Sequence, residues 1–545
     1  MIRAPERPAW TLGVVVTVLI VVTPVLAVIV DAVSRAGSPD LPRGLGSMVA
    51  TTLGLMLGVG LGTLVLGGGL AWLVTAYRFP LRNLLVWLLV LPLAMPAYIL
   101  GFVFLSIFDF AGPVQSALRF TFGAEVWAPE VRSLPGAIIV MSLTLYPYVY
   151  LLARAALIEQ SPLTYDAARM LGASRARAFR RVLLPLARPS LAAGLALVMM
   201  ETLTDFATVQ YFNVRTVSVG VYLVWKGTFD VHSATQLAAL VLLFAVAVLA
   251  GERLLRGGVR FHQRGGRGKG LQPVALTGAR GVSATLACLG VLGAGFVVPV
   301  LQLTVWALRE LGTNPQALLD VRFLEYLTNS AVVAALAAAA CVALSLAMAH
   351  ALRLRGGGRF VRTAAQLTTF GYAVPGAVVG MGVLIAFGVL DWVLVSVGVE
   401  GGTGLLVTGS VAGILYAYVV RFVAPAYQAI DASFAKISPS MTLSAMSLGA
   451  GPRRVLARVH VPLVRSGVAV ALVLVLIDAI KELPIVLLLR PFGFTTVSVW
   501  VFELASENFW QQAALPALLI VLLATVPVFF LLRQVRLVDP HRKVL

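Results

Sequence analysis

Two groups of acidic residues lie inside apolar stretches of this sequence, where charge is otherwise rare. In METLTDFATVQYF, Glu201 and Asp205 are four residues apart and share one helical face. In LIDAIKELP, Asp478 and Glu482 repeat that spacing at an offset of 277 residues, with Lys481 beside them. Carboxylate oxygens suit hard metal cations, and charges inside a membrane usually face a cavity or a partner. The pattern predicts a transit path or gate, a metal site, or structural ion pairing through Lys481.

The elements that carry these charges are too apolar for a water-soluble protein. Of the 545 residues, 59% are hydrophobic and only 12% are charged, which is too little charge to cover a soluble surface. Glu201 lies roughly 16 Å into its apolar run, near the midplane of a bilayer, at about 1.5 Å per residue. We therefore predict an all-α polytopic membrane protein, because runs of about 20 apolar residues can each cross a bilayer as a helix. We expect twelve spans, at about 11–30, 48–76, 84–107, 134–157, 190–212, 234–252, 282–308, 328–352, 364–390, 404–426, 466–489 and 513–533.

The net charge of +19 is unevenly distributed along the chain. The connections 158–189, 251–280 and 427–465 are basic, whereas 108–133 and 391–403 are neutral or acidic. This alternation is the positive-inside pattern of membrane proteins and not the footprint of a nucleic-acid-binding protein. It predicts that both termini and all three basic segments lie in the cytoplasm. The first apolar run is too long for a signal-peptide core, so we interpret it as a membrane helix.

The sequence divides into two similar halves. Residues 1–255 and 281–545 each carry six predicted spans, and a basic Gly/Arg-rich linker at 256–280 separates them. AMPAYILG (94–101) corresponds to AVPGAVVG (373–380), and TVS occurs at 216–218 and again at 496–498. A parallel repeat of this kind predicts a pseudo-two-fold molecule whose substrate path lies near the midplane between the halves.

A basic segment also occurs twice, at 165–185 and 442–462. Gly172 is followed 13 residues later by Pro185, and Gly449 by Pro462 in the same way. Each segment predicts a short helix, a turn at the glycine, and a stop at the proline before the next span. A single copy would fit a basic helix on the lipid surface. Two matched copies favour a two-fold partner.

The spacing of these two segments resembles the coupling-loop motif of the permease subunits of ABC importers: Glu-Ala-Ala, three residues, Gly, nine residues, then Ile-x-Leu-Pro. The first copy has Asp166-Ala167-Ala168, Gly172 and Pro185, and the second has Ser444-Ala445, Gly449 and Pro462, without the acidic residue. The resemblance implies the fold of a type I importer permease. It also implies that Ala168–Ser174 and Ala445–Gly451 dock on two copies of a separate ABC ATPase subunit, and that an extracytoplasmic binding protein delivers the substrate.

Longer strings resemble one branch of that family. LPLAMPAYILGFVF, AGPVQSAL, YPYVYLLARAAL, METLTDFATVQYF and KELPIVLLLRPFGFTT are similar to the fused twelve-span permeases of ferric-iron importers. The resemblance implies a multi-pass protein of the inner membrane that moves ferric iron, a cation suited to hard oxygen ligands. Thiamine, sulfate and polyamine permeases share the fold and remain alternatives.

Few other residues suggest chemistry. GGRGKG (265–270) lacks the spacing and the Ser or Thr of a phosphate loop, so we expect ATP to be used only by the partner subunit and no cofactor to be bound by this chain. Tyr146, Tyr148 and Tyr150 alternate in sequence and are interpreted as interfacial anchors. Cys288 and Cys341 are expected to be buried free thiols. No enzyme active site is predicted, and the metal ligands, if any, are unknown.

Two classes of function besides an ABC importer stay open at this point. An ion-coupled secondary transporter would also have twelve spans and midplane carboxylates, but it gives no reason for a paired coupling segment. A membrane scaffold would have no need of the midplane charges.

Overall fold

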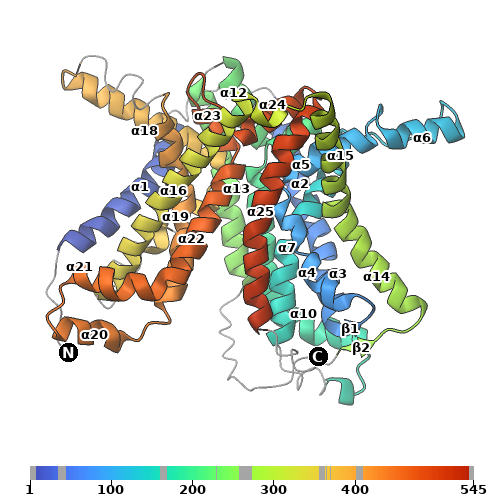
Figure 1. Ribbon diagram of the computed structural model, residues 1–545, viewed down its shortest axis with the longest axis horizontal. Coiled ribbons are helices and arrows are strands. Elements are labelled where there is room, and N and C mark those ends of the chain that lie inside the picture. The colour runs from blue at the N-terminus through green and yellow to red at the C-terminus, as the bar shows by residue number, and fades with distance from the viewer. Residues whose placement is uncertain are drawn as a thin grey trace. The chain divides into compact units, whose positions relative to one another are not determined.

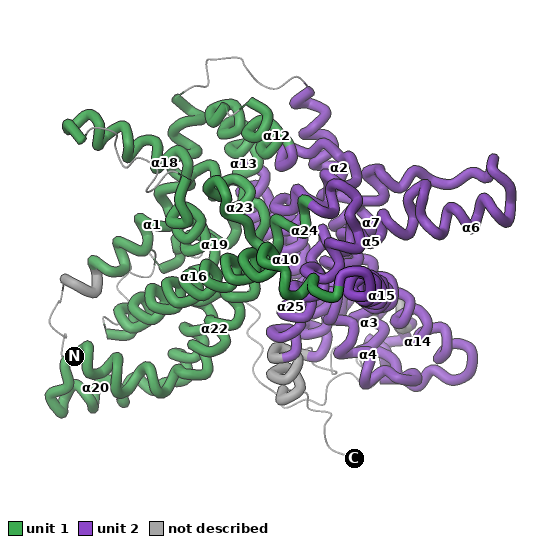
Figure 2. Tube along the Cα trace, turned by 45° about the horizontal axis from the view of Figure 1, so that its top comes forward, with its two compact units in different colours: residues 1–43, 220–242, 315–503 green, residues 44–219, 243–314, 504–545 purple. Residues whose placement is uncertain are grey.

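The computed structural model describes residues 8–34, 44–159, 168–228, 230–256, 273–354, 363, 365–368, 370–399 and 409–538. The chain forms two compact units (Figure 2): unit 1 comprises residues 1–43, 220–242 and 315–503, and unit 2 comprises 44–219, 243–314 and 504–545. The compact units cut across the sequence halves 1–255 and 281–545. Each unit takes most of its helices from one half and its outer helices from the other.

Unit 2 contains the helices of the first half that follow the first span. Its elements are α2 (Leu45–Thr63), η1 (Leu64–Gly68), α3 (Gly69–Ala76), β1 (Tyr77–Arg78), α4 (Arg82–Leu88), η2 (Leu91–Ala94), α5 (Ala97–Phe108), α6 (Pro113–Phe122), α7 (Leu134–Glu159), α9 (Arg175–Ala178), η3 (Phe179–Leu183), α10 (Leu184–Thr204), α11 (Ala207–Tyr211), β2 (Val274–Ala275), α14 (Ala279–Leu292), η4 (Gly293–Val297), α15 (Val298–Thr313) and α25 (Trp510–Val538). The two strands form a short parallel pair in which Tyr77 lies opposite Val274.

Unit 1 contains the first helix of the chain and most of the second half. Its elements are α1 (Pro8–Ser34), η5 (Ala317–Leu319), α16 (Val321–Leu354), η6 (Phe370–Ala373), α18 (Gly376–Ser396), α19 (Val411–Phe434), α20 (Pro439–Ser447), α21 (Pro452–Val455), η8 (Leu456–His460), α22 (Val461–Lys481) and α23 (Pro484–Leu489). Three helices contribute residues to both units: α12 (Val217–Thr228), α13 (Val231–Arg256) and α24 (Val497–Ser506).

The helices confirm the predicted class of an all-α polytopic membrane protein. Among the described residues, eleven helical stretches are long and apolar enough to cross a membrane. The remaining predicted span, 404–426, is occupied over most of its length by α19. A helix satisfies its own backbone N–H and C=O groups, which is why apolar runs of this length adopt it in lipid.

Each unit is built around the same three mutually packed helices. In unit 2 these are α2, α7 and α10, and in unit 1 they are α16, α19 and α22, which lie side by side in Figure 1. The correspondence extends to local detail, since α9, η3 and α10 begin 277 residues before α21, η8 and α22. The internal repeat seen in the sequence is therefore a repeat of structure.

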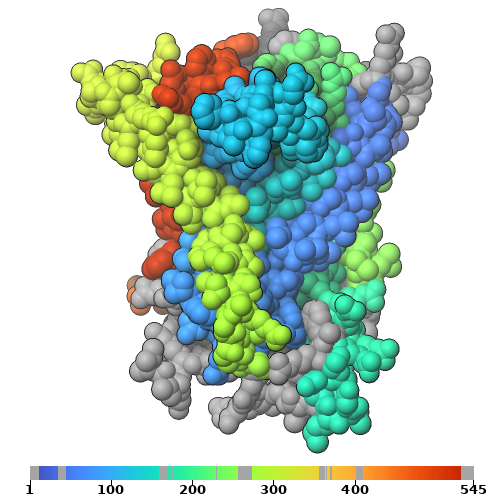
Figure 3. All heavy atoms as spheres, turned by 90° about the vertical axis from the view of Figure 1, so that its right-hand side faces the viewer, coloured from blue at the N-terminus to red at the C-terminus, as the bar shows by residue number. Residues whose placement is uncertain are grey.

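The first helix of each sequence half packs on helices of the other half. In unit 1, α1 packs against α16, α18 and α19 of the second half. In unit 2, α14 packs against α4 and α15 against α5, both of the first half, and α15 also packs against α25 of its own half. The face of unit 2 along which α14 and α15 lie is seen in Figure 3. This exchange is one reason that the compact units differ from the sequence halves; in addition, residues 220–242 belong to unit 1 and residues 504–545 to unit 2.

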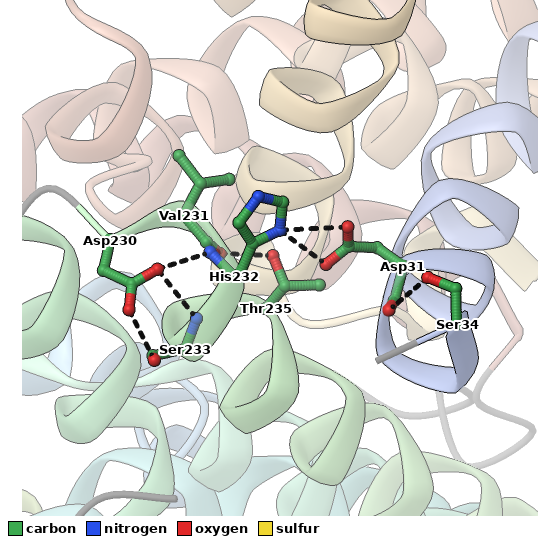
Figure 4. A network of polar contacts seen from close by, with 7 residues as sticks. All are labelled: Asp31, Ser34, Asp230, Val231, His232, Ser233 and Thr235. Atoms are coloured by element: carbon green, nitrogen blue, oxygen red, sulfur yellow. Dashed lines mark hydrogen bonds and ion pairs between the residues drawn. The ribbon is translucent and has the colours of Figure 1, made fainter. Parts of the chain in front are cut away.

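Polar contacts tie the end of α1 to the start of α13 within unit 1 (Figure 4). The Nδ1 atom of His232 lies 3.1 Å from Oδ1 of Asp31. Beside it, Asp230 accepts hydrogen bonds from the hydroxyl of Ser233 at 2.6 Å and from the N–H of His232 at 3.0 Å. These bonds, chiefly the one from the Ser233 side chain, lower the pKa of Asp230 and keep it ionised at the N-terminus of α13.

A matched hydrogen bond holds the start of α12 and of α24. The N–H of Val217 donates to the Thr52 hydroxyl at 3.0 Å, and the N–H of Val497 donates to the Ser330 hydroxyl at 2.9 Å. The first N–H groups of a helix have no hydrogen-bond partner within the helix, and lipid offers no acceptor. Each hydroxyl therefore accepts a hydrogen bond from an N–H group that would otherwise be unpaired.

We expect Ser330→Ala to lower the free energy of unfolding by about 1–3 kcal/mol, because the buried N–H of Val497 loses its acceptor. The change would be measured as a lower unfolding midpoint of the purified protein in detergent. Ser283→Ala is the control, since the exposed Ser283 hydroxyl donates to the carbonyl of Arg280 in its own helix. An unchanged midpoint in Ser330→Ala would show that this contact is dispensable.

Candidate functional site

The two predicted coupling segments adopt the same turn. Gly172 and Gly449 have φ values of 82° and 81°, the left-handed region that favours glycine. The N–H of Gly172 bonds to the carbonyl of Arg169, and that of Gly449 to the carbonyl of Met446. One residue later, Ala173 bonds to the carbonyl of Ala168 and Ala450 to that of Ala445, at 3.0 Å in both cases. This pair of bonds is the Schellman motif that ends a helix at a glycine.

The residues before the two turns differ in what can be described. Asp166 and Ala167 lie outside the described residues, so the first helix of the first segment is seen only from Ala168. In the second segment α20 is complete: Pro439 starts it, and the Ser438 hydroxyl accepts from the N–H of Ser440 at 3.3 Å. The stop predicted at Pro185 and Pro462 is wrong, because η3 runs directly into α10 and η8 into α22. Each proline is the second residue after a π-helical turn, where the regular hydrogen-bond ladder is already interrupted.

A leucine at the tip of each turn was not singled out from the sequence. Leu171 and Leu448 directly precede the two glycines and are 89% and 88% exposed. They occupy matching positions of the repeat. Exposure of a leucine side chain to water is unfavourable, so an exposed leucine in an otherwise basic segment indicates a surface that a partner covers. The signal was available in the sequence, as an apolar residue before the glycine in both copies.

The base of the second segment is held by a buried pair of histidines in unit 1. Nδ1 of His460 lies 2.8 Å from Nδ1 of His350, and Nε2 of His460 lies 3.0 Å from the Thr442 hydroxyl. Both rings are fully buried, and Phe434 packs edge-on against His460. The residue that corresponds to His460 in the first half is Leu183, which is also buried. The two segments thus share a turn but differ in how their bases are anchored.

The acidic pair of the first half lies where α10 ends and α11 begins, in unit 2. Asp205 follows the last residue of α10 and accepts hydrogen bonds from the N–H and the hydroxyl of Thr208, at 2.8 and 2.5 Å. It therefore caps α11. Glu201 lies one turn earlier in α10 and is half-buried. The structure thus gives Asp205 a structural partner in its own segment.

The charged group of the second half lies at the equivalent break, between α22 and α23 in unit 1. Lys481 Nζ lies 2.7 Å from Asp478 Oδ1 in the last turn of α22, the pairing expected as one alternative. Glu482 is buried, and its Oε2 lies 3.4 Å from Nε of Arg421 on α19. Sequence reasoning missed Arg421 because it is 61 positions away in a different span and has no charged counterpart in the first half.

The buried ion pair also explains part of the AVPGAVVG motif. Arg421 Nη1 donates to the carbonyl of Val374 at 3.0 Å. A Cβ atom at Gly376 would lie 2.6 Å from Oε1 of Glu482, so only glycine lets the carboxylate approach this closely. The motif therefore supports the break after α22 as well as starting α18.

The interfacial role expected for the tyrosines of α7 is wrong for two of them. Tyr146 and Tyr150 are fully buried in unit 2, and their hydroxyls donate to the carbonyls of Leu89 and Val86, each at 2.8 Å. These carbonyls lie near the end of α4, where the helix leaves them without partners. The expectation considered the spacing of three tyrosines and overlooked that two of them are one helical turn apart. Cys288 and Cys341 are buried free thiols, as predicted.

No metal-binding cluster of three or more His, Cys, Asp or Glu side chains occurs in the described part of the chain. The linker sequence GGRGKG falls outside the described residues.

The twofold-repeated helical core, with a protruding basic turn in each half and charged helix breaks inside the spans, defines a membrane permease.

Comparison with known proteins places this permease in a family. The family described as binding-protein-dependent transport system inner membrane component matches residues 58–256. A sulfate transport system permease protein of Salmonella typhimurium is 30% identical over 206 residues, which are 37% of this chain and 72% of the relative. The chain belongs to the family of binding-protein-dependent transport system inner membrane components.

Two further relatives show how much of this chain is matched and which other solutes are named for related permeases. An Fe(3+)-transport system permease protein of Haemophilus influenzae is 26% identical over 97% of this chain and 99% of its own length. A molybdenum transport system permease protein of Escherichia coli is 28% identical over 193 residues, or 34% of this chain and 82% of the relative. The chain is thus a fused, two-domain permease, as its similarity to the fused ferric-iron permeases implied.

We expect removal of either partner of the buried pair, by Arg421→Met or Glu482→Leu, to lower the free energy of unfolding by about 3–5 kcal/mol, because the other charge is left buried and unpaired. The free energy of unfolding of the double variant should be closer to that of the parent protein than the value of either single variant. Unfolding midpoints of the four proteins in detergent give the comparison.

Arg490→Gln is the control for this cycle, because the Arg490–Glu503 pair is more exposed and should contribute under about 1 kcal/mol. A double variant as unstable as the sum of the two single variants would contradict the account.

Proposed function

We propose that this chain moves ferric iron across the inner membrane as the permease subunit of an ABC importer. The observation that carries the substrate assignment is the Haemophilus influenzae Fe(3+) permease, which matches this chain from end to end, whereas the sulfate and molybdenum permeases match about a third of it. Membership of the family favours an importer over the secondary transporter and the scaffold.

ATP hydrolysis in this proposal takes place in two copies of a separate subunit, one on each coupling segment. The matched Schellman turns support docking at 168–174 and 445–451, and the exposed Leu171 and Leu448 provide an apolar contact at each tip. Exposed leucines in segments that also carry exposed arginines, such as Arg169 and Arg453, fit a groove with apolar walls and an acidic rim. Closure of the ATPase pair would pull on both segments and switch the path between its two openings.

Orientation follows from the distribution of basic residues. With the coupling segments and both termini in the cytoplasm, the connections 108–133 and 490–513 face outward, where a binding protein would deliver substrate. Helix α6 in the first of these has no buried residue, and it stands out on the face shown in Figure 3. Phe120 and Trp127 are 94% and 82% exposed there, and Phe492 is fully exposed in the second connection. Exposed aromatic side chains of this kind are frequent in protein interfaces.

The sign of the midplane charges supports a cationic substrate. Glu201 and Asp205 bring negative charge to the α10–α11 break, while Lys481 and Arg421 are each paired with a carboxylate. An anionic path lining would attract ferric iron and repel sulfate. Of these residues, Glu201 is the best candidate for substrate contact, because the Asp205 carboxylate already caps α11.

A sulfate importer is the second candidate. Two observations favour it: the Salmonella typhimurium relative and a sulfate transport system permease protein of Escherichia coli that is 31% identical over 203 residues. Thiamine and polyamine importers remain alternatives from the shared fold.

The decisive test is uptake of radiolabelled ferric iron by proteoliposomes that hold the full chain, its ATPase subunit and its binding protein. We expect uptake that requires ATP, and no uptake of sulfate, thiamine or spermidine. Accumulation of sulfate in place of iron would keep the importer and overturn the iron assignment. Iron uptake without ATP would overturn the role of the coupling segments.

We further expect Leu171→Ser with Leu448→Ser to weaken binding of the ATPase at least about tenfold, because both apolar tips are lost while the turns are kept. Binding would be measured by titrating the purified ATPase onto the chain in nanodiscs. Leu254→Ser is the control, since Leu254 is 82% exposed but lies outside both segments. Equal affinity of the double variant and the control would refute docking through the tips.

A further inference from the structure

Unit 2 contains an apolar cavity of about 690 Å³ close to the start of α10. Its walls come from the stretch η1–α3, the end of α7, the first half of α10 and the end of α13. The volume is within the range of pockets that hold small molecules, about 300–1,000 Å³. Gly68 and Gly69 form part of the wall, and a Cβ atom added at either would meet no atom within 4 Å.

The wall has one charged side chain, that of Arg188. Arg188 is exposed and lines the cavity together with Trp72. Trp72 packs edge-on against Tyr77 with 6.2 Å between ring centroids, and such aromatic side chains are enriched at the membrane–water interface. From Arg188 the wall continues along α10 to Leu195, roughly 10 Å further into the span at about 1.5 Å per residue. The cavity thus combines one cationic side chain with walls that are otherwise almost wholly apolar.

We propose that this cavity binds an anionic phospholipid, with an acyl chain between η1–α3 and α10 and the phosphate paired with Arg188. The apolar wall matches a hydrocarbon chain, and guanidinium groups bind phosphate oxygens in a bidentate manner. Arg180 and Arg181, both exposed, precede α10 and add positive charge on the same side of the span. The proposal does not depend on which solute the permease carries.

The cavity adjoins the base of the first coupling segment. Leu184 and Pro185, the end of that segment, are part of its wall. In the second half the corresponding base is fixed internally, through His460, His350 and Thr442. The first half has Leu183 in place of His460, and no hydroxyl or ring nitrogen at that position. A bound lipid would brace the first segment where the second uses buried side chains.

The test uses fluorescence quenching by lipids with brominated acyl chains. The full chain is placed in vesicles that contain phosphatidylglycerol and phosphatidylcholine in equal amounts, and only one of the two lipids is brominated. Quenching of Trp72 is taken as the difference between the parent protein and Trp72→Phe. We expect brominated phosphatidylglycerol to occupy the site about fivefold more than brominated phosphatidylcholine, the ratio given by one basic side chain at a lipid surface.

Two variants with matched controls separate the headgroup from the acyl chain. Arg188→Gln should abolish the preference for phosphatidylglycerol, whereas Arg465→Gln, at the same position of α22 and outside the cavity wall, should keep it. Gly68→Leu should fill the cavity and remove quenching by both lipids, whereas Gly293→Leu, also in a π-helical turn with open space, should not. Equal quenching of the parent protein by the two lipids would overturn the proposal. So would a preference that survives Arg188→Gln, or quenching that survives Gly68→Leu.

Discussion

Inside a bilayer, every backbone N–H and C=O must find a partner within the protein, and this requirement shapes the described structure wherever a helix is broken. Asp205 caps α11 directly after α10 ends. Tyr146 and Tyr150 satisfy carbonyls at the end of α4, and the hydroxyls of Thr52 and Ser330 accept from the first N–H of α12 and of α24. Breaks allow a permease to place polar groups at membrane depth, and each break depends on a side chain from another helix or from its own next turn.

The two halves share this architecture but use different side chains to support it. The break after α10 is supported by Thr208, whereas the break after α22 is supported by the Arg421–Glu482 pair. Both breaks also receive a serine hydroxyl, from Ser218 on the Leu203 carbonyl and from Ser498 on the Glu482 carbonyl. The coupling segments show the same contrast, with Leu183 in one and His460 in the other. The supports in unit 1 thus include a buried ion pair and a buried histidine pair, whereas Thr208 and Leu183 stand at the corresponding places in unit 2. Corresponding positions of the two halves therefore contribute unequally to the free energy of folding.

Much of the fold could be predicted from the sequence. The span positions, the offset of 277 residues and the glycine turns depend on local pattern, so the apolar runs, the repeated strings and Gly172 and Gly449 were sufficient to predict them. The side-chain partners could not be predicted in the same way. Arg421 meets Glu482 and His350 meets His460 across 61 and 110 positions, and no periodicity links such residues. The exchange of the first helices between compact units was also not predicted, because it depends on packing and leaves no mark in composition.

The coupling turns have a consequence for how such segments are recognised. The letters of the second copy depart from the motif at Leu443 and Ser444, yet Ala445 offers its carbonyl to Ala450 as Ala168 does to Ala173. The two copies share a backbone geometry. Any residue can supply the accepting carbonyl when a glycine follows at the required distance. Side chains on the outer surface of the turn are then free to diverge toward different partners. Sequence divergence at such a turn is therefore a poor measure of divergence in backbone conformation.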